Sequence, residues 1–174
     1  ANYTVDIASG VRCGFSWMNL NGVLGNKTLR QAILMGIDND TICSSKTIGG
    51  LYTAGFSVLP STLSYGYDKL VNPYKYDPEG AKKLLDDAGW KDTDGDGIRE
   101  KDGKKLSFTW YTWSSATRRA EKMSAQLKEV GFDMQIETLE WNYMYEKIES
   151  DDYDAGIREL GWAEPILIFN ACYK

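Results

Sequence analysis

Three aspartates at alternate positions form the pattern in this chain that comes closest to a metal-binding site. Asp92, Asp94 and Asp96 precede a glycine, which is how the twelve-residue calcium loop of an EF-hand begins. The twelfth position of such a loop carries a bidentate glutamate, and here that position is Gly103. A helix should also follow, whereas the residues from 106 to 113 predict a strand. We therefore expect a polar turn that holds no ordered metal ion.

Two nearby acids keep a calcium site open as an alternative. Glu100 and Asp102 lie in the same loop, and carboxylate oxygens are the ligands that calcium takes in proteins. Either side chain could replace the missing twelfth ligand. The corresponding function would be that of a calcium-stabilised module of a cell surface.

A second acidic group, Asp151, Asp152 and Asp154, has the residue types of a carboxylate-based hydrolase. These acids lie in a predicted helix-to-strand turn, where a solvated charge cluster is the ordinary arrangement. The chain has no histidine, which removes the commonest general base and the commonest zinc ligand. We expect a protein without catalysis and without a cofactor, and the hydrolase remains an alternative.

Three cysteines, Cys13, Cys43 and Cys172, show no CxxC spacing, which argues against a zinc ribbon or a thioredoxin-type redox pair. We expect them to be small buried hydrophobic side chains, since unpaired cysteine is often buried. One disulfide in an oxidising compartment is the alternative, and the sequence does not choose the pair.

Length and charge limit the class of protein. The 174 residues are 43% apolar and 13% aromatic, which is enough for one domain with a core. The net charge of -5 disfavours nucleic acid as a partner. No run of residues approaches the roughly 20 apolar residues that cross a bilayer. The first residues lack the basic and apolar regions of a signal peptide, so we expect a mature or excised segment.

The first half of the chain predicts three helices with recognisable ends. Asp77 can cap a helix that starts at Pro78 and stops at Gly89, with one apolar stripe between the two ends. Upstream, Asn26 and Asp38 are the expected caps of two further helices. These helices contribute apolar faces to a core.

Two other segments of the first half have different patterns. Aromatic and apolar residues from 12 to 20 predict a strand that ends in an Asn-Gly turn. The region from 49 to 73 is rich in glycine and proline, and we expect a long ordered loop or several short elements there.

The second half of the chain alternates strand and helix patterns. Strands are expected in three segments, at 106–113, 132–138 and 153–160. Helical stripes separate them, from 116 to 130 and from 141 to 148. Such an order with short links implies parallel crossover connections. We therefore predict an α/β fold with a mostly parallel sheet flanked by helices, as a single domain over residues 1–174.

Four blocks of sequence resemble, in the same order, the family 5 extracellular solute-binding proteins, which are the oligopeptide- and dipeptide-binding components of bacterial ABC importers. The blocks are Leu29-Arg30-Gln31-Ala32-Ile33 with Ile37-Asp38, Gly66-Tyr67-Asp68 with Tyr76 to Trp90, Leu127 to Phe132 with Glu140-Trp141, and Tyr153-Asp154-Ala155 with Leu160-Gly161-Trp162. Four blocks in order are much harder to obtain by chance than one motif. The resemblance is specific to the family but not to a ligand.

The resemblance implies one lobe of a type II periplasmic-binding-protein fold, in which two lobes joined by a hinge close around a solute. This chain is similar to the second lobe only, since family members are several times longer. The implied partners are a peptide or another small solute, the first lobe of the same protein and the ABC permease in the membrane. The implied location is extracytoplasmic, either in the periplasm or on a cell-surface lipoprotein.

The resemblance also implies an acid that meets the α-amino group of a bound peptide. In oligopeptide-binding members this acid follows a Gly-Trp pair, and here Glu164 follows Trp162 at a spacing one residue shorter than the usual pattern. A carboxylate suits an ammonium group because charge-assisted hydrogen bonds are about twice as strong as neutral ones. The alternative is a solvated or helix-capping acid.

Aromatic residues are implied as the walls of the ligand cleft. Trp141 follows an acid as the ligand-wall tryptophan of the family does, and a core anchor is the alternative role. Trp113, Trp162 and the loop from Tyr52 to Phe56 are expected to wall the same cleft. Family members use arginines for the peptide carboxylate, and Arg158 lies one position from the matching place.

Overall fold

The computed structural model describes most of the chain. The described residues are 4, 8, 10–46, 49, 52–63, 66–161 and 166–167. The chain forms two compact units. The larger unit comprises Ser16–Ala54 and Pro73–Ile157, and the smaller comprises Ala1–Phe15, Gly55–Asn72 and Arg158–Lys174.

Four strands form a sheet in the order β1-β6-β4-β5. Their bounds are β1 Arg12–Met18, β4 Ser107–Thr112, β5 Asp133–Thr138 and β6 Ala155–Gly161. β4 pairs in parallel with β5, where Ser107 lies opposite Asp133. It also pairs in parallel with β6, where Trp110 lies opposite Ala155. The predicted sheet, mostly parallel and built on these three segments, is confirmed.

A single crossover helix connects the parallel strands β4 and β5. α4 (Thr117–Val130) follows β4 and a short 3-10 helix, η4 (Ser114–Ala116), and it ends at Gly131, which has a left-handed φ of 106°. Its buried residues, Ala120, Met123, Leu127 and Val130, recur every three or four positions and form the predicted apolar stripe. They pack in one core cluster with Phe108 and Trp110, which point inward from β4.

The two helices that follow β1 are capped as their sequences predict. α1 (Lys27–Gly36) starts after the short 3-10 helix η1 (Val23–Gly25), and the Asn26 side chain accepts a hydrogen bond from Thr28 N. α2 (Asn39–Ser44) is capped by Asp38, which accepts from Thr41 N. Gly36 permits close approach of α1 to α4, because a Cβ there would lie 3.1 Å from the side chain of Val130.

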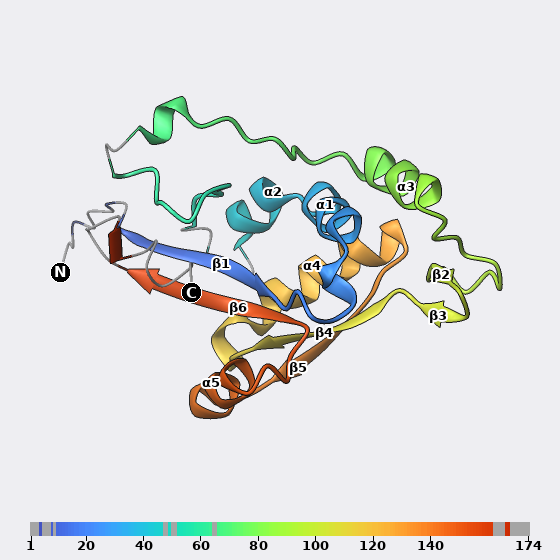
Figure 1. Ribbon diagram of the computed structural model, residues 1–174. Coiled ribbons are helices and arrows are strands. Elements are labelled where there is room, and N and C mark those ends of the chain that lie inside the picture. The colour runs from blue at the N-terminus through green and yellow to red at the C-terminus, as the bar shows by residue number, and fades with distance from the viewer. Residues whose placement is uncertain are drawn as a thin grey trace. The chain divides into compact units, whose positions relative to one another are not determined.

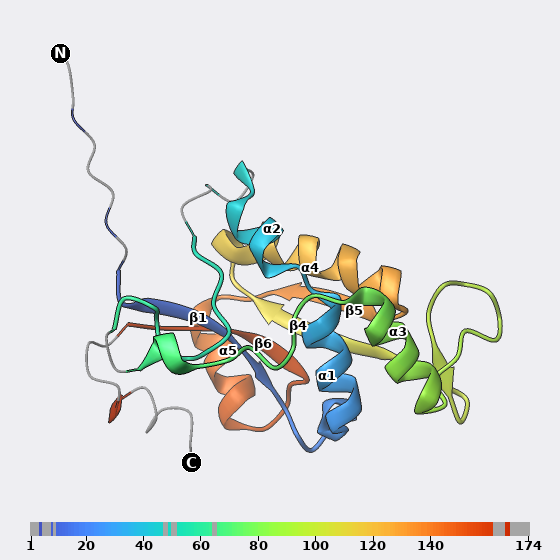
Figure 2. The same cartoon turned by 90° about the horizontal axis from the view of Figure 1, so that it is seen from above.

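The third capped helix packs against the first. α3 (Pro78–Asp87) has Pro78 at its first position, and the Asp77 side chain accepts from Gly80 N. Its Ala81 and Leu85 are fully buried. Figure 2 shows α1, α3 and α4 on the same side of β4 and β5, where their apolar faces enclose the core.

The opposite face of the parallel strands carries one helix. α5 (Trp141–Glu149) is seated by Met144, which is 1% exposed, and its Lys147 ammonium lies 5.1 Å from the ring centre of Tyr111 on β4. Figure 1 shows α5 across the strands from α4, so the larger unit has helices on both faces of the sheet. None of the described helices is both long and apolar enough to cross a membrane.

Short elements complete the described part of the chain. β2 (Glu100–Lys101) and β3 (Lys104–Lys105) form an antiparallel hairpin, whose turn residues Asp102 and Gly103 have φ of 53° and 73°. Between positions 49 and 73, the described residues contain one regular element, the 3-10 helix η3 (Tyr67–Lys69). The predicted long loop with short elements therefore holds for the described residues of that region.

Two of the three cysteines, Cys13 and Cys43, lie within the described residues. Cys43 lies half-buried on α2, and burial raises the pKa of its thiol. Cys13 lies on β1 in the smaller unit, with its Sγ 3.5 Å from the carbonyl oxygen of Ser57. Cys172 is outside the described residues, so the pairing among the three stays open.

A junction of polar groups joins the end of β1 to β4 and to the start of β6. The Asp154 carboxylate accepts a hydrogen bond from Thr109 N at 2.8 Å, and its backbone oxygen accepts from Asn19 N at 2.7 Å. Asn19 is 6% exposed and donates from Nδ2 to the carbonyls of Asp151 and Tyr153. The junction satisfies backbone groups that would otherwise be left unpaired between strands.

Replacement of Asp154 by alanine should therefore destabilise the fold. Without the carboxylate the partly buried Thr109 N–H has no acceptor, which costs about 1–3 kcal/mol. The matched control is Asp152→Ala, because the Asp152 side chain is 78% exposed and makes one surface ion pair, worth less than about 1 kcal/mol. Urea unfolding of both variants measures the difference. Equal losses of unfolding free energy in the two variants would show that the junction does not stabilise the fold more than a surface ion pair does.

Candidate functional site

Three aromatic side chains form a continuous row, called the aromatic row below: Trp113, Trp141 and Tyr145. The ring centres of Trp113 and Trp141 are 5.8 Å apart at an interplanar angle of 66°, and those of Trp141 and Tyr145 are 6.5 Å apart at 38°. Trp113 packs against the core cluster, whereas Trp141 is 48% exposed and Tyr145 43% exposed. The row thus leads from the core to the surface.

The parallel strands explain why these rings meet. Trp113 directly follows β4, and Trp141 begins the helix that follows β5. Since β4 and β5 are parallel, their carboxyl ends lie at the same edge of the sheet. The backbone is closed there by a hydrogen bond from Leu139 N to Thr112 O at 2.8 Å. This edge is where open α/β sheets generally bind ligands.

Two hydroxyl groups accompany the row at the same edge. Thr117 Oγ1 on α4 lies 3.1 Å from Thr138 Oγ1 at the end of β5, and 3.3 Å from the carbonyl oxygen of Trp113. Exposed indole and phenol rings beside hydroxyls can contact apolar and uncharged polar groups of a solute. This arrangement can therefore bind a solute at the carboxyl edge of the strands.

The structure brings together part of the predicted site. Trp113 and Trp141 are in contact, and the half-exposed Trp141 is not a buried core anchor. Arg158 lies half-buried on β6, in the portion of that strand that belongs to the smaller unit. Trp162 and Glu164 lie outside the described residues.

The loop that was expected to add aromatic walls is divided between the two units. The ring of Tyr52 belongs to the larger unit and lies 5.4 Å from the guanidinium of Arg119 on α4. Phe56 belongs to the smaller unit and packs on Tyr67, with ring centres 5.3 Å apart. Tyr145, which was not predicted, has a simple sequence signal: it lies four positions after Trp141, on the same helix face.

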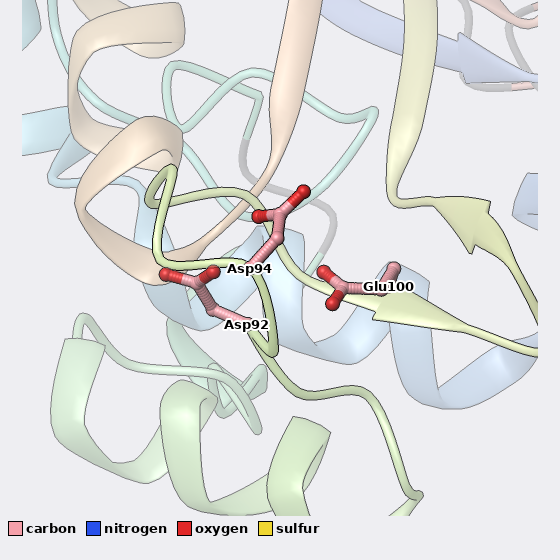
Figure 3. A group of neighbouring side chains, drawn as sticks. All are labelled: Asp92, Asp94 and Glu100. Carbon is pink, nitrogen blue, oxygen red and sulfur yellow. The ribbon is translucent and has the colours of Figure 1, made fainter.

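The acidic loop brings three carboxylates together. Asp92, Asp94 and Glu100 each offer an oxygen within 4.8 Å of the others, and Figure 3 shows Asp92 and Asp94 on the loop and Glu100 on the strand that follows it. Asp92 accepts hydrogen bonds from Gly95 N at 2.8 Å and Gly97 N at 2.9 Å. Both of its oxygens are therefore already bonded to backbone amides of the loop.

The remaining oxygens of the loop have unequal surroundings. Glu100 Oε1 accepts from Thr93 N at 2.7 Å, whereas its Oε2 is buried without a hydrogen-bond partner. The carboxylate of Asp96 contacts the Lys105 ammonium, which also lies 3.2 Å from Asp94. Hydrogen bonds to Asp96 and Asp94 raise the pKa of Lys105, and the same lysine lowers the pKa of Asp96. The Lys105 ammonium therefore neutralises part of the negative charge of the acidic loop.

The three acids considered for a hydrolase serve different structural contacts. Asp151 accepts from the Asn21 side chain at 2.5 Å, and Asp152 pairs with Lys147 at 3.0 Å. The carboxylate of Asp154 accepts from a β4 backbone N–H, as described above. The three acids therefore have separate structural partners.

Comparisons with known proteins agree with this fold. The family described as "Bacterial extracellular solute-binding proteins, family 5 Middle" matches residues 1–165. The oligopeptide-binding protein AppA of Bacillus subtilis is 33% identical over 150 residues, and the match covers 84% of this chain and 28% of AppA. The dipeptide-binding protein of Escherichia coli is 26% identical, over 80% of this chain and 24% of its own length. The chain thus spans less than a third of these relatives.

Solved structures share the fold at similar coverage. The structure of AppA from Bacillus subtilis in complex with a nonapeptide has a TM-score of 0.76 and 30% identity, over 88% of this chain and 32% of that protein. A mannohexaose-bound periplasmic oligopeptide-binding protein from Thermotoga maritima has a TM-score of 0.80 at 23% identity, over 93% and 32%. The expected type II periplasmic-binding-protein fold is confirmed, and the chain belongs to the family 5 bacterial extracellular solute-binding proteins.

Proposed function

We propose that this chain is the second ligand-binding lobe of an ABC-importer binding protein that takes up peptides. The observation that carries the proposal is the aromatic row, because it places a half-exposed indole at the carboxyl edge of the parallel strands. Rigid aromatic rings give a large contact area and accept ligand side chains of different chemistry. A binding protein for varied peptides needs such a surface.

The printed names of relatives favour a peptide over other solutes. AppA and the Escherichia coli relative are named for oligopeptide and dipeptide binding, and a Helicobacter pylori relative was solved with the peptide STSA. Relatives solved with mannohexaose or Fe(III)-EDTA show that the fold also accepts other solutes. The AppA relative, at 33% identity, makes a peptide the preferred assignment for this chain.

The proposal includes partners that this chain does not contain. A first lobe would supply the facing wall, and hinge closure of the two lobes around the solute would present the protein to a membrane permease. The location would be extracytoplasmic, in the periplasm or on a cell-surface lipoprotein. The proposed site consists of Trp113, Trp141 and Trp162 as walls, Glu164 at the amino end of the peptide, and Arg158 at its carboxylate.

Two alternatives have less support. A hydrolase would need acids that share a substrate, whereas Asp151, Asp152 and Asp154 hold separate structural partners. A calcium-stabilised module would need the acidic loop to release Lys105 and to replace the missing twelfth ligand. Substrate turnover with peptides and oligosaccharides tests the first alternative, and calcium-dependent melting tests the second.

The chain alone should bind peptides weakly or not at all. One wall leaves most of a peptide in water, and association must overcome at least about 4 kcal/mol of lost rigid-body freedom before any affinity appears. Calorimetric titration of the 174-residue chain with the tetrapeptide Ser-Thr-Ser-Ala measures this, with the full-length protein as control. Micromolar binding by the chain alone would contradict the half-site proposal.

In the full-length protein, Glu164→Gln should weaken peptides that have a free amino end by about 1.5–3 kcal/mol, the scale of a hydrogen bond to a charged group. N-acetylated peptides carry no ammonium and should lose little. The matched control is Glu129→Gln, because Glu129 is an exposed acid near the opposite end of α4 from the row. Equal losses for free and acetylated peptides in calorimetry would remove Glu164 from this role.

Millimolar calcium should leave the melting temperature of the protein unchanged relative to EDTA. The Lys105 ammonium holds Asp94 and Asp96, and a glycine stands at the twelfth loop position. Lys105→Met is the control, because removal of the ammonium frees both carboxylates and should make melting more sensitive to calcium. A ligand at 100 times its Kd adds about 2.7 kcal/mol, so a calcium-induced rise of several degrees in the unmodified protein would overturn the expectation.

A further inference from the structure

We propose that Tyr145 is a positioning residue that holds the Trp141 indole in one orientation against Trp113. The proposal rests on the proposed solute-binding function for its consequence, but its geometry is independent of any ligand. Trp141 is the residue of the row that offers most surface to a solute, since nearly half of its side chain is exposed. Its orientation therefore decides which ring face a solute meets.

The start of α5 gives the Trp141 side chain little restraint of its own. Trp141 is the first residue of the helix, and the preceding residue, Glu140, makes no side-chain capping hydrogen bond. An exposed side chain with two rotatable bonds at a helix end ordinarily samples several rotamers. A fixed indole thus needs neighbours on both sides.

The row supplies these two neighbours from different elements. Trp113 comes from the end of β4 and meets Trp141 in an edge-type contact at 66°, and it is itself packed on the core. Tyr145 comes from the next turn of α5 and meets Trp141 in a tilted contact at 38°. Ring pairs at such distances and angles are favourable beyond the area they bury.

Tyr145 can act as a support because the helix turn that carries it is anchored. The adjacent Met144 is 1% exposed, and Lys147 contacts both the Tyr111 ring and Asp152. The second turn of α5 is therefore held on the sheet on both sides of Tyr145. Contact with the Tyr145 ring extends that restraint to the first turn and to Trp141.

The same helix contains a matched comparison. Tyr143 is also a tyrosine on α5 and is 64% exposed, yet within the described residues it makes no ring-to-ring contact. If Tyr145 served only solubility or helix formation, its replacement would act like the replacement of Tyr143. A positioning role predicts that the two differ.

The test uses circular dichroism of the ligand-free chain. Two indoles in contact at an angle give an excitonic band, which is assigned to this pair by its loss in Trp113→Phe and Trp141→Phe. Tyr145→Ala should remove most of the band, and Tyr145→Phe should keep it because the ring remains. Tyr143→Ala should also keep it. Tyr145→Leu replaces the alanine variant if urea unfolding shows that alanine disturbs the helix.

An intact band in both Tyr145→Ala and Tyr145→Leu would overturn the positioning role, as would equal loss in Tyr143→Ala. Binding of Ala-Phe-Ala-Ala to the full-length protein is the second measurement, where Tyr145→Ala should weaken affinity about 2- to 10-fold and Tyr145→Phe should not. Loss of the band with unchanged peptide affinity would support the positioning role while it contradicts the row as the peptide wall, so the two failures are distinguishable.

Discussion

The hydrogen bond from Thr109 N to the Asp154 carboxylate is the interaction on which the arrangement of the sheet depends. The carboxylate accepts the Thr109 N–H of β4, and the backbone oxygen of the same residue accepts the N–H of Asn19. One residue therefore joins the end of β1, the entry to β6 and the central strand β4. A partly buried backbone N–H without an acceptor costs about 1–3 kcal/mol, so the register of β4 beside β6 is tied to this side chain. That register in turn decides which residues lie at the carboxyl edge.

Features with local causes could be predicted from the sequence. The caps Asn26, Asp38 and Asp77 bond to backbone groups two or three residues away, and Gly131 stops α4 through its own left-handed φ. Such short-range chemistry leaves a readable pattern along the chain. The parallel order of the three strands was also predictable. A helical segment separates each strand from the next, so consecutive strands are joined by crossovers and not by the short hairpin turns that make strands antiparallel.

Contacts between distant positions had no comparable pattern. Asn19 and Asp154 are separated by most of the chain, and no sequence pattern near either residue predicts their hydrogen bond. Lys105 reaches Asp94 and Asp96 only because a two-residue turn folds the hairpin back on the loop. In the candidate site, the contact of Trp113 with Trp141 follows from strand order, whereas the part played by Tyr145 depends on the angle at which α5 leaves β5.

Acidic and aromatic side chains have different roles in the described part of this chain. Among the described acids, Asp92 and Asp154 accept hydrogen bonds from backbone amides, and Asp96 and Asp152 pair with lysines, so these four stabilise the fold. The aromatic row has the opposite character, since Trp141 and Tyr145 keep much of their surface outside the core. An exposed indole gains free energy only when a second surface removes it from water. The larger unit therefore uses described charged groups to stabilise its turns and leaves the Trp141 and Tyr145 rings partly in water, available to a second surface.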